Sequence, residues 1–384
     1  MYDGTGFDSA VHDRSVADKL WHMHWPLIVL VSCLSGIGVI ELFSAAGGSF
    51  APWAERQLVR FVCGLALMFC ITIVPMRVWL GLAWPTYGAA VVLLAGVLWS
   101  GTAAMGARRW LQLGPLSLQP SEIAKIGVVL MLARYYQWLP ARRISRPLWV
   151  LLPLLLIAMP VALTIKQPDL GSALLLLALG LTVMFLAGVS AFYFVGGGIA
   201  TIVLAPLVWD RLHDYQRKRI ATFLNPEQDL LGAGYHIQQS KIALGSGGLT
   251  GKGFMQSTQS AMNALPEKHT DFIFSIFGEE MGFVGTAAVV VLYAATLIVL
   301  IGMALRCHSQ FGRLTIAGVA VTLFISVFVN IAMVIGVVPV VGVPLPFISY
   351  GGTSMISGLI GFGLAMCAFV NRTERIRPEL MRAI

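Results

Sequence analysis

Eight of the ionisable residues inside or at the ends of strongly apolar segments are candidates for chemistry, because a charge there is costly. An ionisable group within a bilayer costs several kcal/mol unless it is paired or hydrated, so each is a candidate for a functional site. Their chemistry would be proton transfer and the binding of charged groups. The eight residues are Glu41, Glu122, Lys125, Lys166, Asp169, Asp271, Glu279 and Glu280.

Asp271 is the candidate for acid–base chemistry. It follows His269 and Thr270 and is followed at once by Phe272, so it should lie at the rim of an apolar segment. A carboxylate in that position could act as a general base. A structural role as a helix N-cap fits the local sequence equally well. Further along the same segment, the adjacent Glu279 and Glu280 cannot both face lipid cheaply, so at least one should face a cavity or a partner.

Glu122 and Lys125 are three residues apart, which places them on one face of a helix. Pro120 and Ser121 just before them are helix start signals. The two side chains are therefore either a self-neutralising pair near a helix start or the polar wall of a central cavity. The spacing does not separate these interpretations.

Two further charged segments have a structural and a functional interpretation. Asp169, three residues after Lys166, can cap the next helix. Arg108 and Arg109 present guanidinium groups that match phosphate oxygens, but they can also anchor Trp110 at lipid headgroups. In both segments the local sequence favours the structural interpretation.

Two glycine- or proline-rich segments interrupt the apolar pattern. Gly245–Gly253 (GSGGLTGKG) lacks both the first glycine and the final Ser or Thr of a phosphate-binding P-loop, and it predicts a flexible hinge. Pro339–Pro346 cannot continue a helix, and irregular backbone at membrane depth is tolerated only where it lines a protein cavity. We expect it to form part of an outer-side pocket together with the residues just after it, Ser349, Tyr350, Gly351 and Gly352.

The composition is that of a polytopic membrane protein. The 384 residues are 57% hydrophobic and only 11% charged, with a mean hydropathy of +0.81. These values exclude a soluble enzyme, a disordered chain and a disulfide-stapled domain, since soluble domains are about 25% charged. Four of the five cysteines lie in apolar runs and none forms a C-x-x-C pair, so we predict neither a disulfide framework nor a zinc site.

The apolar segments predict an all-α fold with ten transmembrane helices, because about 20 apolar residues are needed to cross a bilayer. Residues 25–370 would form this membrane domain. The candidate spans are Trp25–Ala46, Leu58–Val74, Val78–Ser100, Ser121–Trp138, Pro147–Ile165, Leu170–Ala187, Ala191–Trp209, Phe272–Met303, Leu314–Val338 and Ser349–Val370.

The net charge of +8 is explained by topology. With the N-terminus inside, the inside segments hold more Lys and Arg than the short outside loops, which favours cytoplasmic tails at 1–24 and 371–384. Nucleic acid is therefore not needed as a partner. The long segment 210–270 would lie outside the membrane and would contain a short amphipathic helix, Tyr235–Leu244, at the membrane surface.

Several long segments in register resemble the SEDS family (shape, elongation, division and sporulation) of bacterial peptidoglycan glycosyltransferases. The resemblance covers nearly the whole chain, and the order and spacing of the segments fit as well. Val337–Pro346 is more similar to the elongation members of the family than to its division members. The matching segments are residues 108–125, 166–175, 235–253, 265–285 and 337–354.

The resemblance implies an enzyme of the bacterial cytoplasmic (inner) membrane that acts on lipid II, a disaccharide-pentapeptide linked through pyrophosphate to undecaprenol. The family's essential Asp corresponds to Asp271, and its conserved polar pair to Glu122 and Lys125 in the same cavity. By analogy, Arg108 or Arg109 would bind the pyrophosphate. The remaining residues expected to bind substrate or line the cavity are Lys166, Asp169, His269, Ser349, Tyr350, Gly351 and Gly352.

The family also implies partners: a class B penicillin-binding protein, which is a transpeptidase with one transmembrane helix, and other proteins of the elongation machinery. No cofactor is certain from the sequence, which leaves room for a divalent cation at the pyrophosphate. A division-type member, a lipid II flippase and a non-catalytic scaffold are the alternatives. Charges at the outer ends of the spans, at Glu122, Asp169 and Asp271, favour outer-face chemistry over a flippase. A scaffold does not explain why buried charges are retained.

Overall fold

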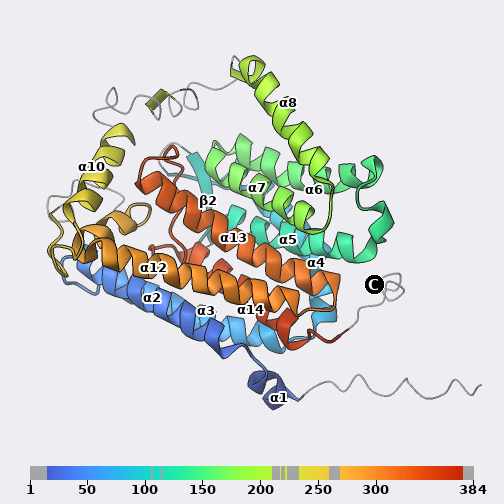
Figure 1. Ribbon diagram of the computed structural model, residues 1–384, viewed down its shortest axis with the longest axis horizontal. Helices are drawn as coiled ribbons and strands as arrows, with labels where there is room; N and C mark the ends of the chain where they lie inside the picture. Colours follow the sequence, from blue (N-terminus) through green and yellow to red (C-terminus); the bar gives the residue numbers. More distant parts are fainter. Residues whose placement is uncertain are drawn as a thin grey trace, which may run out of the picture.

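Helices form at every one of the predicted spans in the computed structural model, which describes residues 15–104, 107–113, 116–209, 217, 221–222, 233–258 and 269–374 (Figure 1). The predicted segment 210–270 and the two predicted tails lie partly outside these residues. The long helices are α2 (Trp25–Ala45), α3 (Ala54–Ile73), α4 (Met76–Ser100), α5 (Pro120–Trp138), α6 (Pro147–Lys166), α7 (Leu170–Leu186), α8 (Ala191–Trp209), α12 (Ile273–Leu305), α13 (Gln310–Val334) and α14 (Gly352–Val370).

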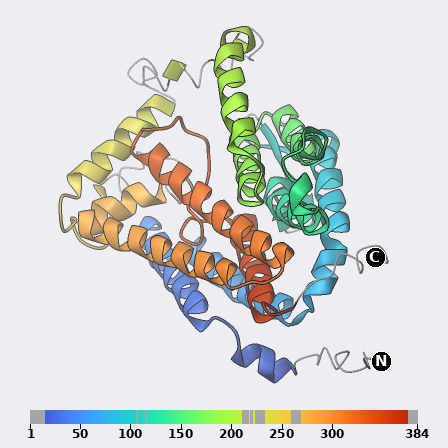
Figure 2. The ribbon, with the colours of Figure 1, turned by 45° about the vertical axis from the view of Figure 1, so that its right-hand side comes forward.

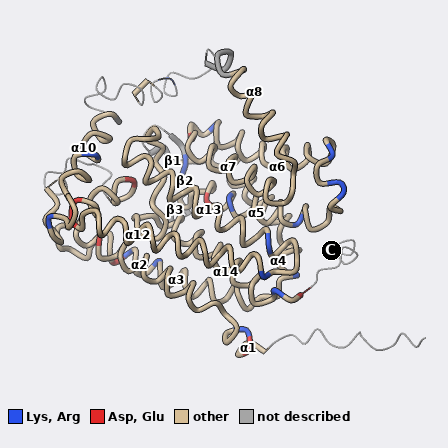
Figure 3. The backbone as a smooth tube through the Cα atoms, in the orientation of Figure 1, with Lys and Arg blue, Asp and Glu red and all other residues tan. Residues whose placement is uncertain are grey.

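Seven of the described helices are long and apolar enough to cross a membrane: α2, α3, α4, α6, α12, α13 and α14. The backbone of these helices carries few charged residues along most of its length (Figure 3). The helix α7 and the Ala191–Leu204 part of α8 are shorter apolar helices, and α5 carries the Glu122–Lys125 pair. The chain is thus an all-helical multi-pass membrane protein.

The helix α14 is the most buried of the seven long apolar helices, and 14 of its 19 residues are buried. It packs against α3, α5 and α13, and glycines allow the close approach to α3. A β-carbon on Gly363 would lie 3.1 Å from the Cα of Met68. In contrast, α8 extends beyond the other helices in Figures 1 and 2.

The last two helices differ from their predicted spans at the C-terminal end of α13 and at the N-terminal end of α14. The helix α13 ends at Val334 rather than Val338, because Gly336 adopts a φ of +76° and Pro339 follows. The helix α14 begins at Gly352 rather than Ser349. As predicted, the segment between them is irregular from Pro339 to Pro346.

A small antiparallel sheet between α4 and α5 was not predicted. Its strands are β1 (Thr102–Ala104), β2 (Ala107–Leu113) and β3 (Leu116–Leu118), in the order β1-β2-β3. The sequence does contain a signal for it, since polar and apolar residues alternate around Gly114-Pro115, a turn-forming pair. The sheet holds Arg109 at the end of the bundle where α5 begins.

Two short helices also lie outside the predicted spans. The helix α1 (Val16–Trp21) falls in the predicted N-terminal tail, and Nζ of its buried Lys19 donates to the carbonyl of Ile73 at the end of α3 (2.8 Å). A 3₁₀ turn, Ala141–Arg143, connects α5 to α6.

The helix α12 is broken at Gly282, whose φ of 67° and ψ of −164° are not helical. The glycine-rich segment 247–253 inserts at the break and bonds to its free backbone groups. The amides of Lys252 and Gly253 donate to the carbonyls of Glu279 and Glu280 (both 3.0 Å), and the amide of Phe283 donates to Gly248 (2.9 Å). The segment is therefore packed, and the flexible hinge predicted from its glycines is wrong.

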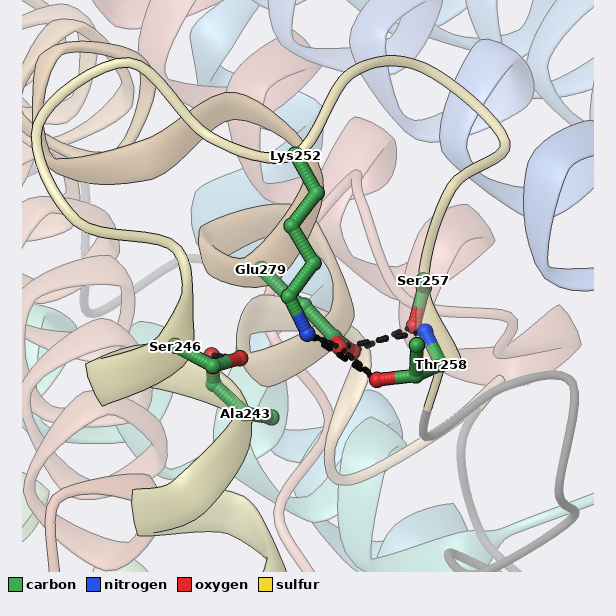
Figure 4. A network of polar contacts seen from close by, with 6 residues as sticks. All are labelled: Ala243, Ser246, Lys252, Ser257, Thr258 and Glu279. Atoms are coloured by element: carbon green, nitrogen blue, oxygen red, sulfur yellow. Dashed lines mark hydrogen bonds and ion pairs between the residues drawn. The ribbon is translucent and has the colours of Figure 1, made fainter.

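The two adjacent glutamates of α12 both have partners within the protein, and Figure 4 shows those of Glu279. Nζ of Lys252 lies 2.5 Å from Oε1 of the buried Glu279, and the Ser257 hydroxyl donates to its Oε2 (2.6 Å). The carboxylate of Glu280 accepts from the Ser44 hydroxyl (2.5 Å) and from the amide of Met255. The prediction that at least one of them faces a partner is confirmed for both.

The predicted amphipathic helix forms as α10 (Ala233–Ser246), but its apolar face packs against protein. Ile237, Ser240 and Ala243, spaced three residues apart, are buried. The Ser240 hydroxyl donates to the carbonyl of Val334 at the end of α13 (2.8 Å) and lies 2.7 Å from the Ser275 hydroxyl on α12. The buried face of this helix therefore does not lie on the membrane surface.

We predict that Gly282→Ala destabilises the protein. A β-carbon at residue 282 would lie 2.7 Å from the carbonyl atoms of Leu249, and the positive φ costs an alanine about 1–3 kcal/mol. The control is Gly302→Ala in the same helix, where nothing lies within 4 Å and alanine favours the helix by about 1 kcal/mol. The midpoint of thermal unfolding in detergent should fall for Gly282→Ala only. Equal midpoints would contradict the close packing of the segment 247–253 against the break at Gly282.

Candidate functional site

Asp271 lies half-buried in the turn before α12, and neighbouring segments hold the backbone on both sides of it. The carbonyl of Asp271 accepts a hydrogen bond from Nδ2 of Asn330, near the end of α13 (2.9 Å). The carbonyl of His269, two residues earlier, accepts from the amide of Tyr350, just before α14 (2.9 Å). The turn is thus attached to both helices that follow α12.

Gly342, in the irregular segment between α13 and α14, lies beside both Asp271 and Arg109. A β-carbon built on this glycine would be 3.4 Å from Oδ2 of Asp271 and 4.0 Å from Nη1 of Arg109. Its φ of +78° is one that side chains rarely adopt. The Asp271 carboxylate and the Arg109 guanidinium therefore both border the small space beside Gly342, a residue with no side chain.

Arg109 is oriented by the turn between α6 and α7. Its Nε lies 3.6 Å from Oδ2 of Asp169, and its Nη2 donates to the carbonyl of Pro168 (3.3 Å). The other carboxylate oxygen of the buried Asp169 accepts from the amide of Ser172 (3.3 Å), so this residue also caps α7. The structural interpretation of Asp169 holds, and the ion pair adds to it.

Glu122 and Lys125 form a buried ion pair at the start of α5. Nζ of Lys125 lies 2.7 Å from Oε1 of Glu122, whose Oε2 accepts from the Ser357 hydroxyl on α14 (3.0 Å). Because each charge has a partner inside the protein, much of the cost of burying it is offset. The pair lines a pocket between α5, α13 and α14.

This pocket contains about 620 Å³ of empty space, part of it open to solvent. Its walls are mainly apolar, with Val129, Val319, Leu323 and Phe362 among them. Asp271 is not among the described residues that line it, although the resemblance implies one cavity for both. The start of α14 is attached to the sheet by Thr353, whose hydroxyl donates to the carbonyl of Ser117 in β3 (3.0 Å).

One face of α3 braces the segment around His269 and Tyr350. Trp53 stacks on the His269 ring (4.4 Å between centroids, 5° between planes), and Gln57 donates to the carbonyl of Ser349 (2.9 Å). The guanidinium of Arg60 lies 4.7 Å from the centre of the Tyr350 ring. None of these three residues, Trp53 just before α3 and Gln57 and Arg60 on it, was predicted from the sequence. Their spacing of four and three residues would place them on one helix face.

The remaining predicted site residues fall into two groups. Ser349 is buried and accepts from the amide of Leu345 (2.7 Å), while Gly351 and Gly352 form the start of α14 beside Arg60. They shape the segment that holds the Asp271 turn. Lys166 is exposed at the end of α6, and of Arg108 only the backbone, in β2, is described.

Comparison with known proteins gives matches over nearly the whole chain. The sequence profile of the family FTSW_RODA_SPOVE, described as cell cycle protein, matches residues 20–374. The peptidoglycan glycosyltransferase MrdB of Escherichia coli (strain K12) is 42% identical over 361 residues, which cover 92% of this chain and 95% of MrdB.

Two solved structures are similar in fold as well as in sequence. A chain of a peptidoglycan synthase complex that coordinates polymerization and crosslinking has a TM-score of 0.81 at 37% identity, covering 92% of this chain and 99% of that chain. The crystal structure of the rod shape determining protein RodA of Thermus thermophilus has a TM-score of 0.70 at 33% identity, covering 92% and 98%.

We predict that Lys125→Met destabilises the protein strongly, because it leaves the Glu122 carboxylate buried without its cation. Removing one partner of a buried pair costs roughly 3–5 kcal/mol. The double variant Glu122→Gln/Lys125→Met should recover most of that loss, since no charge is then stranded. The readout is the midpoint of thermal unfolding in detergent. Losses that simply add in the double variant would show that the two side chains are not coupled.

Proposed function

The chain belongs to the SEDS family (FtsW/RodA/SpoVE) and is a peptidoglycan glycosyltransferase of the RodA/MrdB type, and we propose that it polymerises lipid II with Asp271 as general base. The observation that carries the proposal is the space beside Gly342, which both the Asp271 carboxylate and the Arg109 guanidinium adjoin. Transfer of a sugar from a pyrophosphate carrier uses two groups. A base takes the proton of the acceptor hydroxyl, and a cation binds the pyrophosphate.

In this mechanism the 4-hydroxyl of the acceptor sugar attacks the anomeric carbon of the donor strand. Asp271 accepts the proton of that hydroxyl as the new glycosidic bond forms. The bond between the anomeric carbon and undecaprenyl pyrophosphate breaks, and the pyrophosphate carries away the electron pair. Arg109, held by Asp169, stabilises the charge that develops on the leaving pyrophosphate. The pocket lined by Glu122 and Lys125 is otherwise mainly apolar, which suits a lipid-linked substrate.

The topology that we propose has ten spans, with both tails in the cytoplasm and the segment 210–270 outside the bacterial cytoplasmic membrane. The membrane domain is then residues 25–370, between tails at 1–24 and 371–384. In support, Glu122 lies in the first turn of α5, Asp169 caps α7 and Asp271 lies in the turn before α12, and Arg109 pairs with Asp169 and lies beside the same glycine as Asp271. The end of the bundle that holds these residues would be the outer face, where elongation of the cell wall takes place.

The partners that we propose are a class B penicillin-binding protein and other proteins of the elongation machinery. The support is the similarity to a chain from a synthase complex that couples polymerization to crosslinking. The described residues hold no cluster of three His, Cys, Asp or Glu side chains that could bind a metal ion. No step of the mechanism is assigned to a divalent cation.

We predict that Asp271→Asn abolishes glycan polymerisation, and Asp271→Ala likewise, because the acceptor proton then has no base. Loss of a general base lowers the rate roughly 10²–10⁴-fold. The assay supplies labelled lipid II to the purified protein with its transpeptidase partner and measures glycan chains. As a control, Glu374→Gln removes a carboxylate that pairs with Arg77 near the end of the chain described here, and it should keep full activity.

The same variants separate polymerisation from lipid II translocation. Full polymerisation by Asp271→Ala would end the assignment of Asp271 as base. Translocation of lipid II across vesicles by a protein that makes no glycan would favour the flippase. The clustering of charges at one end of the bundle, rather than along the full depth of the membrane, argues for the enzyme.

A further inference from the structure

Asn330 is a fully buried polar residue in the last two turns of α13, with none of its surface exposed. Its Nδ2 donates two hydrogen bonds, one to the carbonyl of Asp271 (2.9 Å) and one to the carbonyl of Val343 (2.7 Å). A primary amide carries two N–H donors on one nitrogen, and here both are used on segments that are far apart in sequence.

The two carbonyls held by Asn330 belong to the two segments that meet at Gly342. Asp271 supplies the proposed base. Val343 follows Gly342, the residue beside which Oδ2 of Asp271 and Nη1 of Arg109 both lie. One planar amide group therefore ties the segment that carries the proposed base to the Gly342–Val343 segment beside it.

The stability of the helix does not explain an asparagine at this position. Asparagine is a poor helix former, and a buried amide loses its hydration. Among the described residues, Oδ1 of Asn330 has no hydrogen-bond partner, and an unsatisfied buried acceptor costs about 1–3 kcal/mol. A leucine of similar size would avoid both costs. The two hydrogen bonds from its N–H donors to Asp271 and Val343 therefore explain the asparagine better.

We propose that Asn330 is a positioning residue for glycosyl transfer, which fixes the Asp271 carboxylate beside Gly342 and Arg109. It does not touch the reacting atoms and acts only through Asp271 and Val343. The inference rests on the proposed function, because it assigns a geometric role around the proposed base. A displacement of about 1 Å at a reacting group can cost on the order of 10²-fold in rate.

The proline-rich segment has other attachments, which provide a matched comparison. The hydroxyl of the buried Tyr293 on α12 donates to the carbonyl of Pro346 (2.5 Å), and Ser349 accepts from the amide of Leu345. Tyr293→Phe removes one buried hydrogen bond from the same segment but leaves Asp271 untouched. Its effect therefore measures what loosening the segment does by itself.

The experiment compares Asn330→Asp and Asn330→Leu with Tyr293→Phe in the full-length protein with its partner, using labelled lipid II. Both Asn330 variants keep the size of the side chain and lose both N–H donors. We expect kcat to fall about 10–100-fold with KM changed less than about twofold. Tyr293→Phe should lower the thermal midpoint yet change kcat by less than about threefold, since one buried hydrogen bond is worth about 1 kcal/mol.

The outcomes are decisive in each direction. Wild-type kcat in Asn330→Leu would overturn the proposal, and so would a loss of kcat in Tyr293→Phe as large as that in the Asn330 variants. A loss that appears only in KM would also overturn it. Asp271→Asn is assayed in parallel: activity there would end the proposed function itself, whereas inactive Asp271→Asn with active Asn330 variants would end only this inference.

Discussion

The need to satisfy backbone hydrogen bonds without water governs this structure. Inside a bilayer an unpaired amide or carbonyl costs several kcal/mol, so irregular backbone persists only where protein groups bond to it. The two irregular segments of the described bundle meet this requirement in different ways. The 247–253 segment pairs its amides with the carbonyls freed by the break at Gly282. The segment between α13 and α14 is held mainly by side chains, from Asn330, Tyr293, Ser349 and Gln57.

The same constraint explains why the site lies where it does. Helices α12, α13 and α14 start or stop at one end of the bundle, and the bonds that complete their ends also bring distant residues together. The carbonyls of His269 and Asp271 are both used in this way. Some of the groups that hold the fold at this end therefore also set the position of the proposed base.

Opposite charges pair at Glu279, at Glu122 and at Arg109, and the pairs differ in how much of each charged group stays accessible. Glu279 is enclosed by Lys252, Ser257 and Thr258, so it stabilises the break in α12. Glu122 and Lys125 neutralise each other but still line a pocket. Arg109 is held by Asp169 through Nε while its Nη1 adjoins the space beside Gly342. This last arrangement orients a cation without covering it, which is what binding an anionic leaving group requires.

The sequence by itself determined that this is a membrane protein, where its long helices lie and which charged residues are candidates. The length of an apolar segment and the cost of burying a charge in it are local properties. It also carried the family, through long segments in register. Only the tertiary structure decided which charges meet. It left Lys166 exposed, paired Arg109 with Asp169, packed the 247–253 segment into α12 and placed Asn330 between Asp271 and Val343. These outcomes depend on contacts between segments far apart in the chain, where a hydrogen bond or ion pair is defined by tenths of an ångström that no local pattern encodes.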